Sequence, residues 1–333
     1  MTINTKRTIK WLIAIILFVS ATLLFIWRLM PFSYTEMKNS VVSVEHRYYY
    51  TLDSRDSTLF YFDGISADSL FVNLSEDKHE VIRHSLGCWV NEIPLIPSCK
   101  RRIATFKEHC DSSVFVEDNF RTYIANEQSR LENNLAGYEH AEKELRYYFD
   151  THARADEGYS KVKRYREELE SKIEHTEKMI EKLNEASQLS KLYVNRHDSY
   201  YIEYKDVKSS NVRKVCTPTA SLYDNMLLQT CDSITPKGVN TVATWHLCPF
   251  DIKEINDTVF IIGRTFVNEN DSVRRDIEFI PEHLAGSSLT SSPRLNIPEG
   301  APVFTRSGIF IGITSGDTII NRDIIRKSLK GSK

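Results

Sequence analysis

Two neighbouring stretches near the carboxyl end carry most of the fold prediction: Pro298-Glu-Gly-Ala-Pro-Val-Phe304 and Ser307-Gly-Ile-Phe-Ile-Gly-Ile313. Proline and glycine mark tight turns, because proline presets φ and glycine adopts positive φ without a steric cost. The β-branched and aromatic residues after each turn are typical of strands. The segment therefore predicts a sharp loop, a strand, a tight turn and a second strand.

This segment resembles the end of a trypsin-like serine protease, where Gly-Asp/Asn-Ser-Gly-Gly/Ser-Pro leads into two strands joined by a tight turn. In that family the glycines shape the loop that exposes the serine and aims backbone N–H groups at the oxyanion. Gly300, Ala301 and Pro302 match the end of the motif, and Gly308 and Gly312 match the following turn and strand. The resemblance implies two β-barrels and a terminal helix, which we place at residues 322–329.

An upstream segment extends the resemblance into the first half of the chain. Gly87-Cys-Trp-Val90 resembles the Gly-x-Trp/Phe-Val strand of the family. Leu95-Ile-Pro-Ser-Cys-Lys100 resembles the following segment, which carries the catalytic histidine of the family. The order is that of the family, with the histidine segment in the first β-rich half and the serine loop in the second.

The residues that the chemistry requires are replaced. The nucleophile position falls on Glu299, after Pro298, and the histidine position falls on Cys99 or Lys100. An ionised carboxylate only accepts hydrogen bonds, so an imidazole cannot activate it as it activates an alcohol. Loss of a triad member removes most of the rate enhancement. The resemblance therefore implies a catalytically inactive protease-like module that binds a protein or peptide.

Two other function classes stay open. An active peptidase would need a serine and a histidine from outside the family alignment, and candidates are His84, His109, Ser291 and Ser292. A mechanical envelope spacer would need helical arms that associate between chains. A net charge of −2 gives no electrostatic reason to expect nucleic acid as a partner.

The middle of the chain changes from strand patterning to heptads. Apolar residues recur every seven positions in two arms, and the seam would comprise Leu131, Leu135, Leu145, Leu169, Ile173 and Ile180. Gly158 lies between the arms, which favours an antiparallel coiled-coil hairpin and allows oligomers through the coil. The fold class expected is mainly β, of the two-barrel type, with this hairpin inserted. The β-rich halves span residues 40–117 and 197–333, on either side of the hairpin at residues 118–193.

The first thirty residues predict a membrane anchor. Every side chain from Trp11 to Trp27 is apolar except Ser20 and Thr22, and about 20 such residues span a bilayer. We expect a transmembrane helix at residues 11–30 in contact with the lipid bilayer. Lysine and arginine are more frequent before this helix than after it, which predicts that residues 1–10 are cytoplasmic and the bulk of the chain lies outside.

The cysteines are even in number and none forms a CxxC pair, which favours disulfides in an oxidising compartment. The disulfide candidates are Cys88, Cys99, Cys110, Cys216, Cys231 and Cys248. His109-Cys110 and His246-Leu-Cys248 lack the spacing of a zinc site. We therefore expect no metal site and no cofactor.

Overall fold

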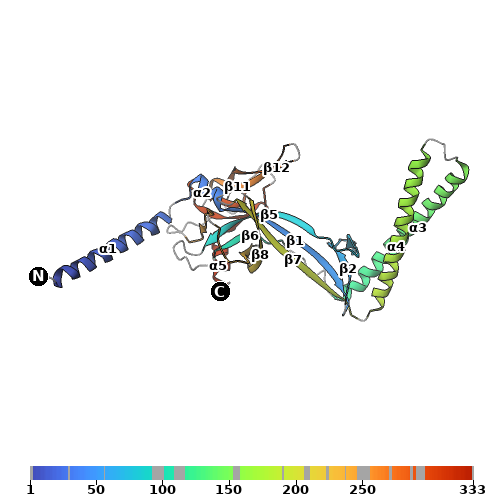
Figure 1. Ribbon diagram of the computed structural model, residues 1–333, viewed down its shortest axis with the longest axis horizontal. Helices are drawn as coiled ribbons and strands as arrows, with labels where there is room; N and C mark the ends of the chain where they lie inside the picture. The colour runs from blue at the N-terminus through green and yellow to red at the C-terminus, as the bar shows by residue number, and fades with distance from the viewer. Residues whose placement is uncertain are drawn as a thin grey trace. The chain divides into compact units, whose positions relative to one another are not determined.

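The computed structural model describes residues 3–28, 31–55, 57–91, 101–108, 117–152, 158–189, 191–205, 211–222, 225–236, 238–245, 256–269, 272–285, 288–289 and 297–331. Its helices are α1 (Ile3–Arg28), α2 (Tyr34–Ser40), α3 (Glu117–Thr151), α4 (Tyr159–Gln188) and α5 (Arg322–Gly331) (Figure 1). The chain forms two compact units. Unit 1 comprises Met1–His46, Ile82–His109 and Ser199–Lys333, and unit 2 comprises Arg47–Val81 and Cys110–Asp198.

The first β-barrel is a ring of six strands. These strands are β1 (Val41–Asp53), β5 (Val81–Asn91), β6 (Arg102–Phe106), β7 (Tyr193–Lys205), β8 (Asn211–Leu222) and β9 (Asn225–Thr230). They follow the order β5-β6-β9-β8-β7-β1, and a further pairing between β5 and β1 closes the ring. Two more strands extend the sheet, β10 (Val242–Ala243) beside β5 and β2 (Thr58–Phe62) beside β1. A separate pair is formed by β3 (Gly64–Ile65) and β4 (Phe71–Val72).

The second β-barrel also has six strands. They are β11 (Asn256–Glu269), β12 (Ser272–Ala285), β13 (Ser288–Leu289), β14 (Pro302–Thr305), β15 (Phe310–Ser315) and β16 (Thr318–Asn321). The barrel closes in the order β11-β12-β13-β16-β15-β14. Its β14 and β15 are the two strands predicted from residues 298–313. The mainly-β, two-barrel part of the predicted fold class is confirmed.

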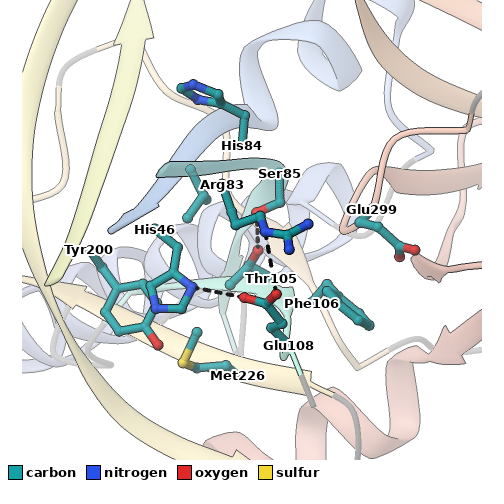
Figure 2. Close-up of a pocket in the computed structure, with 11 residues that line it drawn as sticks. His46, Arg83, His84, Ser85, Thr105, Phe106, Glu108, Tyr200, Met226 and Glu299 are labelled. Atoms are coloured by element: carbon teal, nitrogen blue, oxygen red, sulfur yellow. Dashed lines mark hydrogen bonds and ion pairs between the residues drawn. The ribbon is translucent and has the colours of Figure 1, made fainter. Parts of the chain in front are cut away.

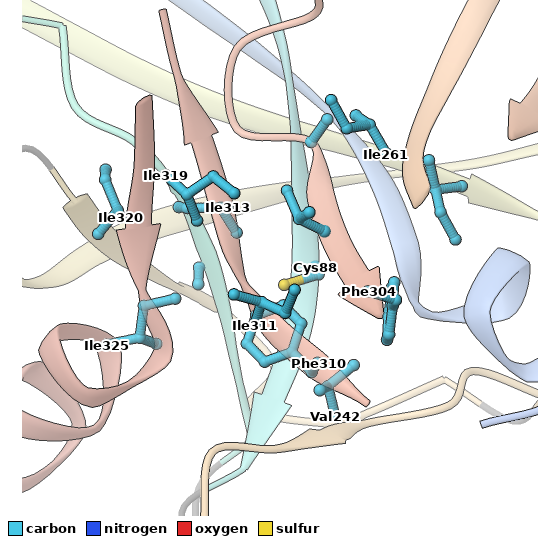
Figure 3. Packing of buried hydrophobic residues seen from close by; sticks show 14 of the residues in the cluster. Cys88, Val242, Ile261, Phe304, Phe310, Ile311, Ile313, Ile319, Ile320 and Ile325 are labelled. Carbon is cyan, nitrogen blue, oxygen red and sulfur yellow. The ribbon is translucent and has the colours of Figure 1, made fainter. Parts of the chain in front are cut away.

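Side chains of the first barrel alternate between two hydrophobic cores. On β5, Cys88 and Val90 belong to a core that both barrels share, whereas Trp89 belongs to the interior core of the first barrel. On β6, Ala104 belongs to the shared core and Ile103 to the interior one. This alternation follows from the period of two along a strand. The second barrel contributes to the shared core Ile261, Phe304, Phe310, Ile311, Ile313, Ile319 and Ile320 (Figure 3).

The segment before β1 packs against the second barrel. The backbone N–H of Phe32 donates to the carbonyl of Gly308 at 2.9 Å, and the Phe32 ring stacks on Phe304 with centroids 6.2 Å apart. Ser33 and Glu36 form a reciprocal capping box that starts α2. The amino-terminal side of the first barrel is therefore fastened to the second.

The last helix connects the second barrel back to the first. Helix α5 follows the final strand of the second barrel and contacts β8 and β9 of the first. Ile325 is fully buried in the shared core, and the Ser328 hydroxyl donates to Asn225 Oδ1 at 3.1 Å. The terminal helix predicted at residues 322–329 is thus present, and it helps to hold the two barrels together.

Unit 2 has a core of its own, where the first turns of α3 and the last turns of α4 meet strands. The buried residues of this core are Tyr48, Tyr50, Leu52, Phe60, Phe62, Phe71, Phe120, Tyr123, Ile124, Met179, Leu183, Ala186 and Leu192. Large aromatic side chains dominate it, and rings such as Tyr50 and Phe62 stack with centroids 5.4 Å apart. Each such ring buries about 150–250 Å², so this cluster is the main source of stability in the unit.

The predicted coiled-coil hairpin is wrong. A coiled coil requires a continuous seam of buried side chains along both helices. On α3, none of the side chains between Gln128 and His152 is fully buried. Among the predicted seam residues only Leu169 is fully buried, and those left half-buried are Leu131, Leu135, Leu145, Ile173 and Ile180. Most of the fully buried side chains of the two helices lie where the helices join the aromatic core.

The predicted membrane anchor is contradicted as well. In the part of the chain that the structure describes, no helix is both long enough and apolar enough to cross a membrane. The predicted single-pass membrane topology, which placed residues 31–333 on the outer side of the membrane, is contradicted by the same finding.

The predicted disulfides are not formed by the cysteines that the structure describes. Cys88, Cys216 and Cys231 are free thiols. Cys88 and Cys216 are buried among apolar side chains of two different cores, and Cys231 is exposed, so each lies in a different environment. Burial raises the pKa of the Cys88 thiol, and it is also the main cause that raises the pKa of Cys216 to about 12. The remaining candidates, Cys99, Cys110 and Cys248, lie outside the described residues.

Candidate functional site

The turn before β14 holds the residues predicted as the nucleophile loop. Gly300 has a φ of 75°, in the region that favours glycine, and is buried. A Cβ at this position would lie 2.1 Å from the carbonyl oxygen of Leu86 on β5. Only glycine fits, because the turn comes into backbone contact with the other barrel. The glycine that carried the family resemblance is thus required by this packing.

Thr314 on β15 holds the same turn from the other side. The N–H of Gly300 donates to the Thr314 carbonyl at 3.0 Å, and the N–H of Ala301 donates to its hydroxyl oxygen at 2.9 Å. The Thr314 hydroxyl in turn donates to the carbonyl of Pro298 at 2.6 Å. Two backbone donors of the turn are therefore committed inside the protein. No local sequence pattern points to Thr314, because its role depends on strand pairing.

Glu299 makes contacts with both barrels. Its carbonyl accepts the N–H of Leu86 on β5 at 2.8 Å. Its two carboxylate oxygens lie 2.9 and 3.1 Å from the backbone N of Gly316, in the turn between β15 and β16, and accept its N–H. Glu299, which was predicted from the sequence to fall at the nucleophile position, therefore accepts structural hydrogen bonds in this conformation.

A cavity of about 150 Å³ lies within unit 1 beside this turn (Figure 2). Its apolar lining comprises Val44, Phe106, Tyr200 and Met226. Its polar lining comprises His46, Arg83, His84, Ser85, Thr105, Glu108 and Glu299. All of the first barrel's lining residues come from β1, β5, β6, β7 and β9 or from the residues just after β6, so the end of that barrel forms most of the wall.

Glu108 is the centre of a charge cluster in the cavity. Its Oε2 lies 3.4 Å from His46 Nδ1, and its Oε1 lies 3.6 Å from Arg83 Nε. Figure 2 shows the Arg83 guanidinium and the His46 ring directed toward the same carboxylate. The His46 ring also stacks on Tyr200, with centroids 4.4 Å apart and planes 9° from parallel. The imidazole is thus held by a carboxylate at its edge and by an aromatic ring on its face.

The hydroxyl of Ser85 faces a threonine. Ser85 Oγ is 3.5 Å from Thr105 Oγ1, and the Thr105 hydroxyl donates to the carbonyl of Leu86 at 2.7 Å. A serine nucleophile needs a base within hydrogen-bond reach, about 2.6–3.2 Å. The Thr105 hydroxyl is not such a base.

Sequence reasoning located only part of this site. Glu299 lines the cavity, with Gly300, Ala301 and Pro302 directly after it, as the predicted turn. His84, one of the alternative catalytic candidates, also lines the cavity. The predicted positions Cys99 and Lys100, and the candidates His109, Ser291 and Ser292, lie outside the described residues.

Other residues of the site were missed. His46, Arg83 and Glu108 have ordinary neighbours in the sequence, and only the pairing of β1, β5 and β6 brings them together.

For metals, no cluster of three or more His, Cys, Asp or Glu suited to an ion occurs among the described residues. The pairs His109-Cys110 and His246-Leu-Cys248 lie outside them.

The two closed six-stranded barrels, with the Pro298–Pro302 turn leading into β14, match the two-barrel fold of trypsin-like proteases. The chain was also compared with known proteins. No protein-family model and no curated protein matches the sequence. A solved structure described as the crystal structure of Deg5 is similar to this chain over 39% of its residues and 66% of the Deg5 chain, just under two thirds. The sequence identity is 15% and the TM-score 0.30.

Proposed function

We propose that this chain is a peptide-binding module on a trypsin-like two-barrel fold, and that its nucleophile turn performs no acyl transfer. The observation that carries the proposal is the carboxylate of Glu299, which occupies the nucleophile position and accepts the N–H of Gly316. Acyl transfer by this fold needs a hydroxyl that a base deprotonates, and an ionised carboxylate has no proton to give.

The alternative of an active peptidase has one candidate pair in the cavity, the His46 imidazole with the Glu108 carboxylate. A carboxylate that orients an imidazole is part of a catalytic triad. The serine of the cavity does not complete it, because Ser85 Oγ lies against Thr105 Oγ1. This arrangement favours binding over hydrolysis.

Peptide binding is supported by the cavity itself. It combines an apolar wall with a small number of polar and charged groups, which is the usual make-up of a specific ligand site. Its wall includes Glu299, so a ligand in the cavity would contact the turn at the nucleophile position. A protein of this fold that performs no acyl transfer can therefore still bind a ligand in the cavity beside the turn.

The test uses the purified full-length chain. One sample is treated with a fluorophosphonate probe, with active trypsin as the positive control, and a second is mixed with a diverse peptide library. We expect no labelled serine, no cleaved peptide in the mass spectrum, and a subset of peptides retained by the immobilised protein. Stoichiometric labelling of one serine, or cleavage that its replacement by alanine abolishes, would overturn the proposed inactivity. Retention of no peptide would overturn the binding function.

A further inference from the structure

We infer that the cavity binds the carboxyl-terminal residue of a peptide, whose apolar side chain enters the cavity while its free carboxylate pairs with Arg83. This inference rests on the proposed peptide-binding function and specifies the ligand. It comes from three properties of the lining: its volume, its apolar wall and the balance of its charges.

The volume fits a single side chain. The cavity measures about 150 Å³, and apolar cavities of about that size accommodate one benzene-sized group. Phe106 and Met226 line it together with Val44 and the ring of Tyr200. Burying an apolar side chain there removes its surface from water, which favours binding.

The charges of the lining favour an anionic group on the ligand. Glu108 already faces two partners within the protein, the His46 ring and the Arg83 guanidinium. The carboxylate of Glu299 is turned to the Gly316 N–H. Both carboxylates of the lining are thus engaged within the protein, so a ligand carboxylate meets donors with little opposing charge.

Arg83 is the donor best placed for that carboxylate. Its Nε is 3.6 Å from Glu108, longer than a hydrogen bond, and its side chain is 61% exposed. A guanidinium carries five N–H donors in a planar fork that suits a carboxylate. Arg83 can therefore keep its ion pair with Glu108 and still donate to a ligand.

The apolar group and the carboxylate of the ligand must lie close to each other. The apolar wall and Arg83 line the same small cavity, so the apolar group and the carboxylate have to belong to one residue or to adjacent ones. The last residue of a peptide carries both on a single Cα atom. A lysine or arginine side chain is disfavoured, because it would meet Arg83 and two histidines, His46 and His84.

The experiment measures binding of matched peptides to the full-length protein by fluorescence anisotropy. Each peptide ending in leucine or phenylalanine is compared with the same sequence carrying a carboxyl-terminal amide. We expect amidation to weaken binding about tenfold, the effect of losing one charge-assisted hydrogen bond. Arg83→Gln should weaken binding of the free acid to the level of the amide and leave the amide unchanged. Arg326→Gln, on α5 and outside the cavity, is the matched control and should change neither.

A second variant tests the depth of insertion. Phe106→Ala enlarges the cavity and should shift the preference from a terminal leucine toward a terminal tryptophan. Equal binding of acid and amide, or an Arg83→Gln effect no larger than that of Arg326→Gln, would overturn the inference. Peptide retention that is insensitive to the terminus leaves the proposed binding function standing, whereas retention of no peptide at all counts against that function itself.

Discussion

The carboxylate of Glu299 accepts the backbone N–H of Gly316, with its two oxygens 2.9 and 3.1 Å from the nitrogen. Gly316 adopts a φ of 55° in the turn between β15 and β16. The Glu299 side chain therefore fixes a neighbouring turn of the same barrel.

Removal of this carboxylate should loosen the turn without unfolding the barrel. We expect Glu299→Ala to lower the free energy of unfolding by about 1 kcal/mol, because a partly exposed, charge-assisted hydrogen bond is lost. Glu299→Gln keeps a neutral acceptor and should lose less. Hydrogen exchange at the Gly316 amide, measured by NMR, should accelerate in Glu299→Ala. Unchanged exchange would show that the bond does not protect this amide.

Two glycines with positive φ should respond differently to alanine. Gly158→Ala adds a Cβ into open space at a φ of 91°, so it should cost only the backbone strain of about 1–2 kcal/mol. Gly300→Ala adds the same kind of strain and also a clash at 2.1 Å with the Leu86 carbonyl. We expect a loss of more than about 4 kcal/mol or failure to fold, as for other changes that force backbone to move. Urea unfolding measures the free energy of unfolding of the two variants. Equal losses of stability would contradict the close contact between position 300 and the Leu86 carbonyl.

The helices of unit 2 should be sensitive only at the aromatic core. Leu183→Ala removes a fully buried side chain and should destabilise unit 2 by about 2–5 kcal/mol. Leu135→Ala changes a half-buried residue and should cost less than about 1 kcal/mol. Thermal unfolding followed by helical circular dichroism measures both. Stability losses of similar size in the two variants would instead support a coiled-coil seam that includes Leu135.

The described thiols should react in the order of their exposure. Cys231 is exposed and should be alkylated first by iodoacetamide, whereas Cys88 and Cys216 are buried and should react only on unfolding. Peptide mapping by mass spectrometry distinguishes the three. Rapid modification of Cys88 in the folded protein would contradict its place in the core.

The Cys216 thiol also predicts a dependence of stability on high pH. Its folded pKa is raised from 9.0 to about 12, chiefly by burial and then by the nearby Cys231. The folded state therefore favours the neutral thiol, and this contribution is complete below about pH 9 and is lost as the pH rises toward 12. Urea unfolding at pH 8 and pH 10.5 should show a decrease in the wild type that is smaller in Cys216→Ala. An equal decrease in both would assign the effect to other groups.

Sequence reasoning succeeded where structure depends on neighbours along the chain. The turn at Gly300 and the strands that follow it were predicted because turn chemistry and β-propensity act over a few residues. The coiled coil was a wrong prediction for the opposite reason. Its heptad spacing was real, but whether Leu135 is buried depends on what packs against it. The fully buried residues of α3 lie in its first turns, and most of those of α4 lie in its last turns.

The sequence by itself determined that position 299 carries a carboxylate, and that a glycine turn there leads into a pair of strands. Only the tertiary structure decided what that carboxylate does, because Gly316 becomes its partner through the pairing of β14 with β15. The same holds for the cavity, where His46 and Glu108 are 3.4 Å apart although 62 positions separate them in the chain (108 − 46 = 62). Local chemistry is fixed by residue type and spacing, whereas a site is fixed by which strands pair. Pairing depends on contacts between residues far apart in the chain, and no short stretch of sequence contains them.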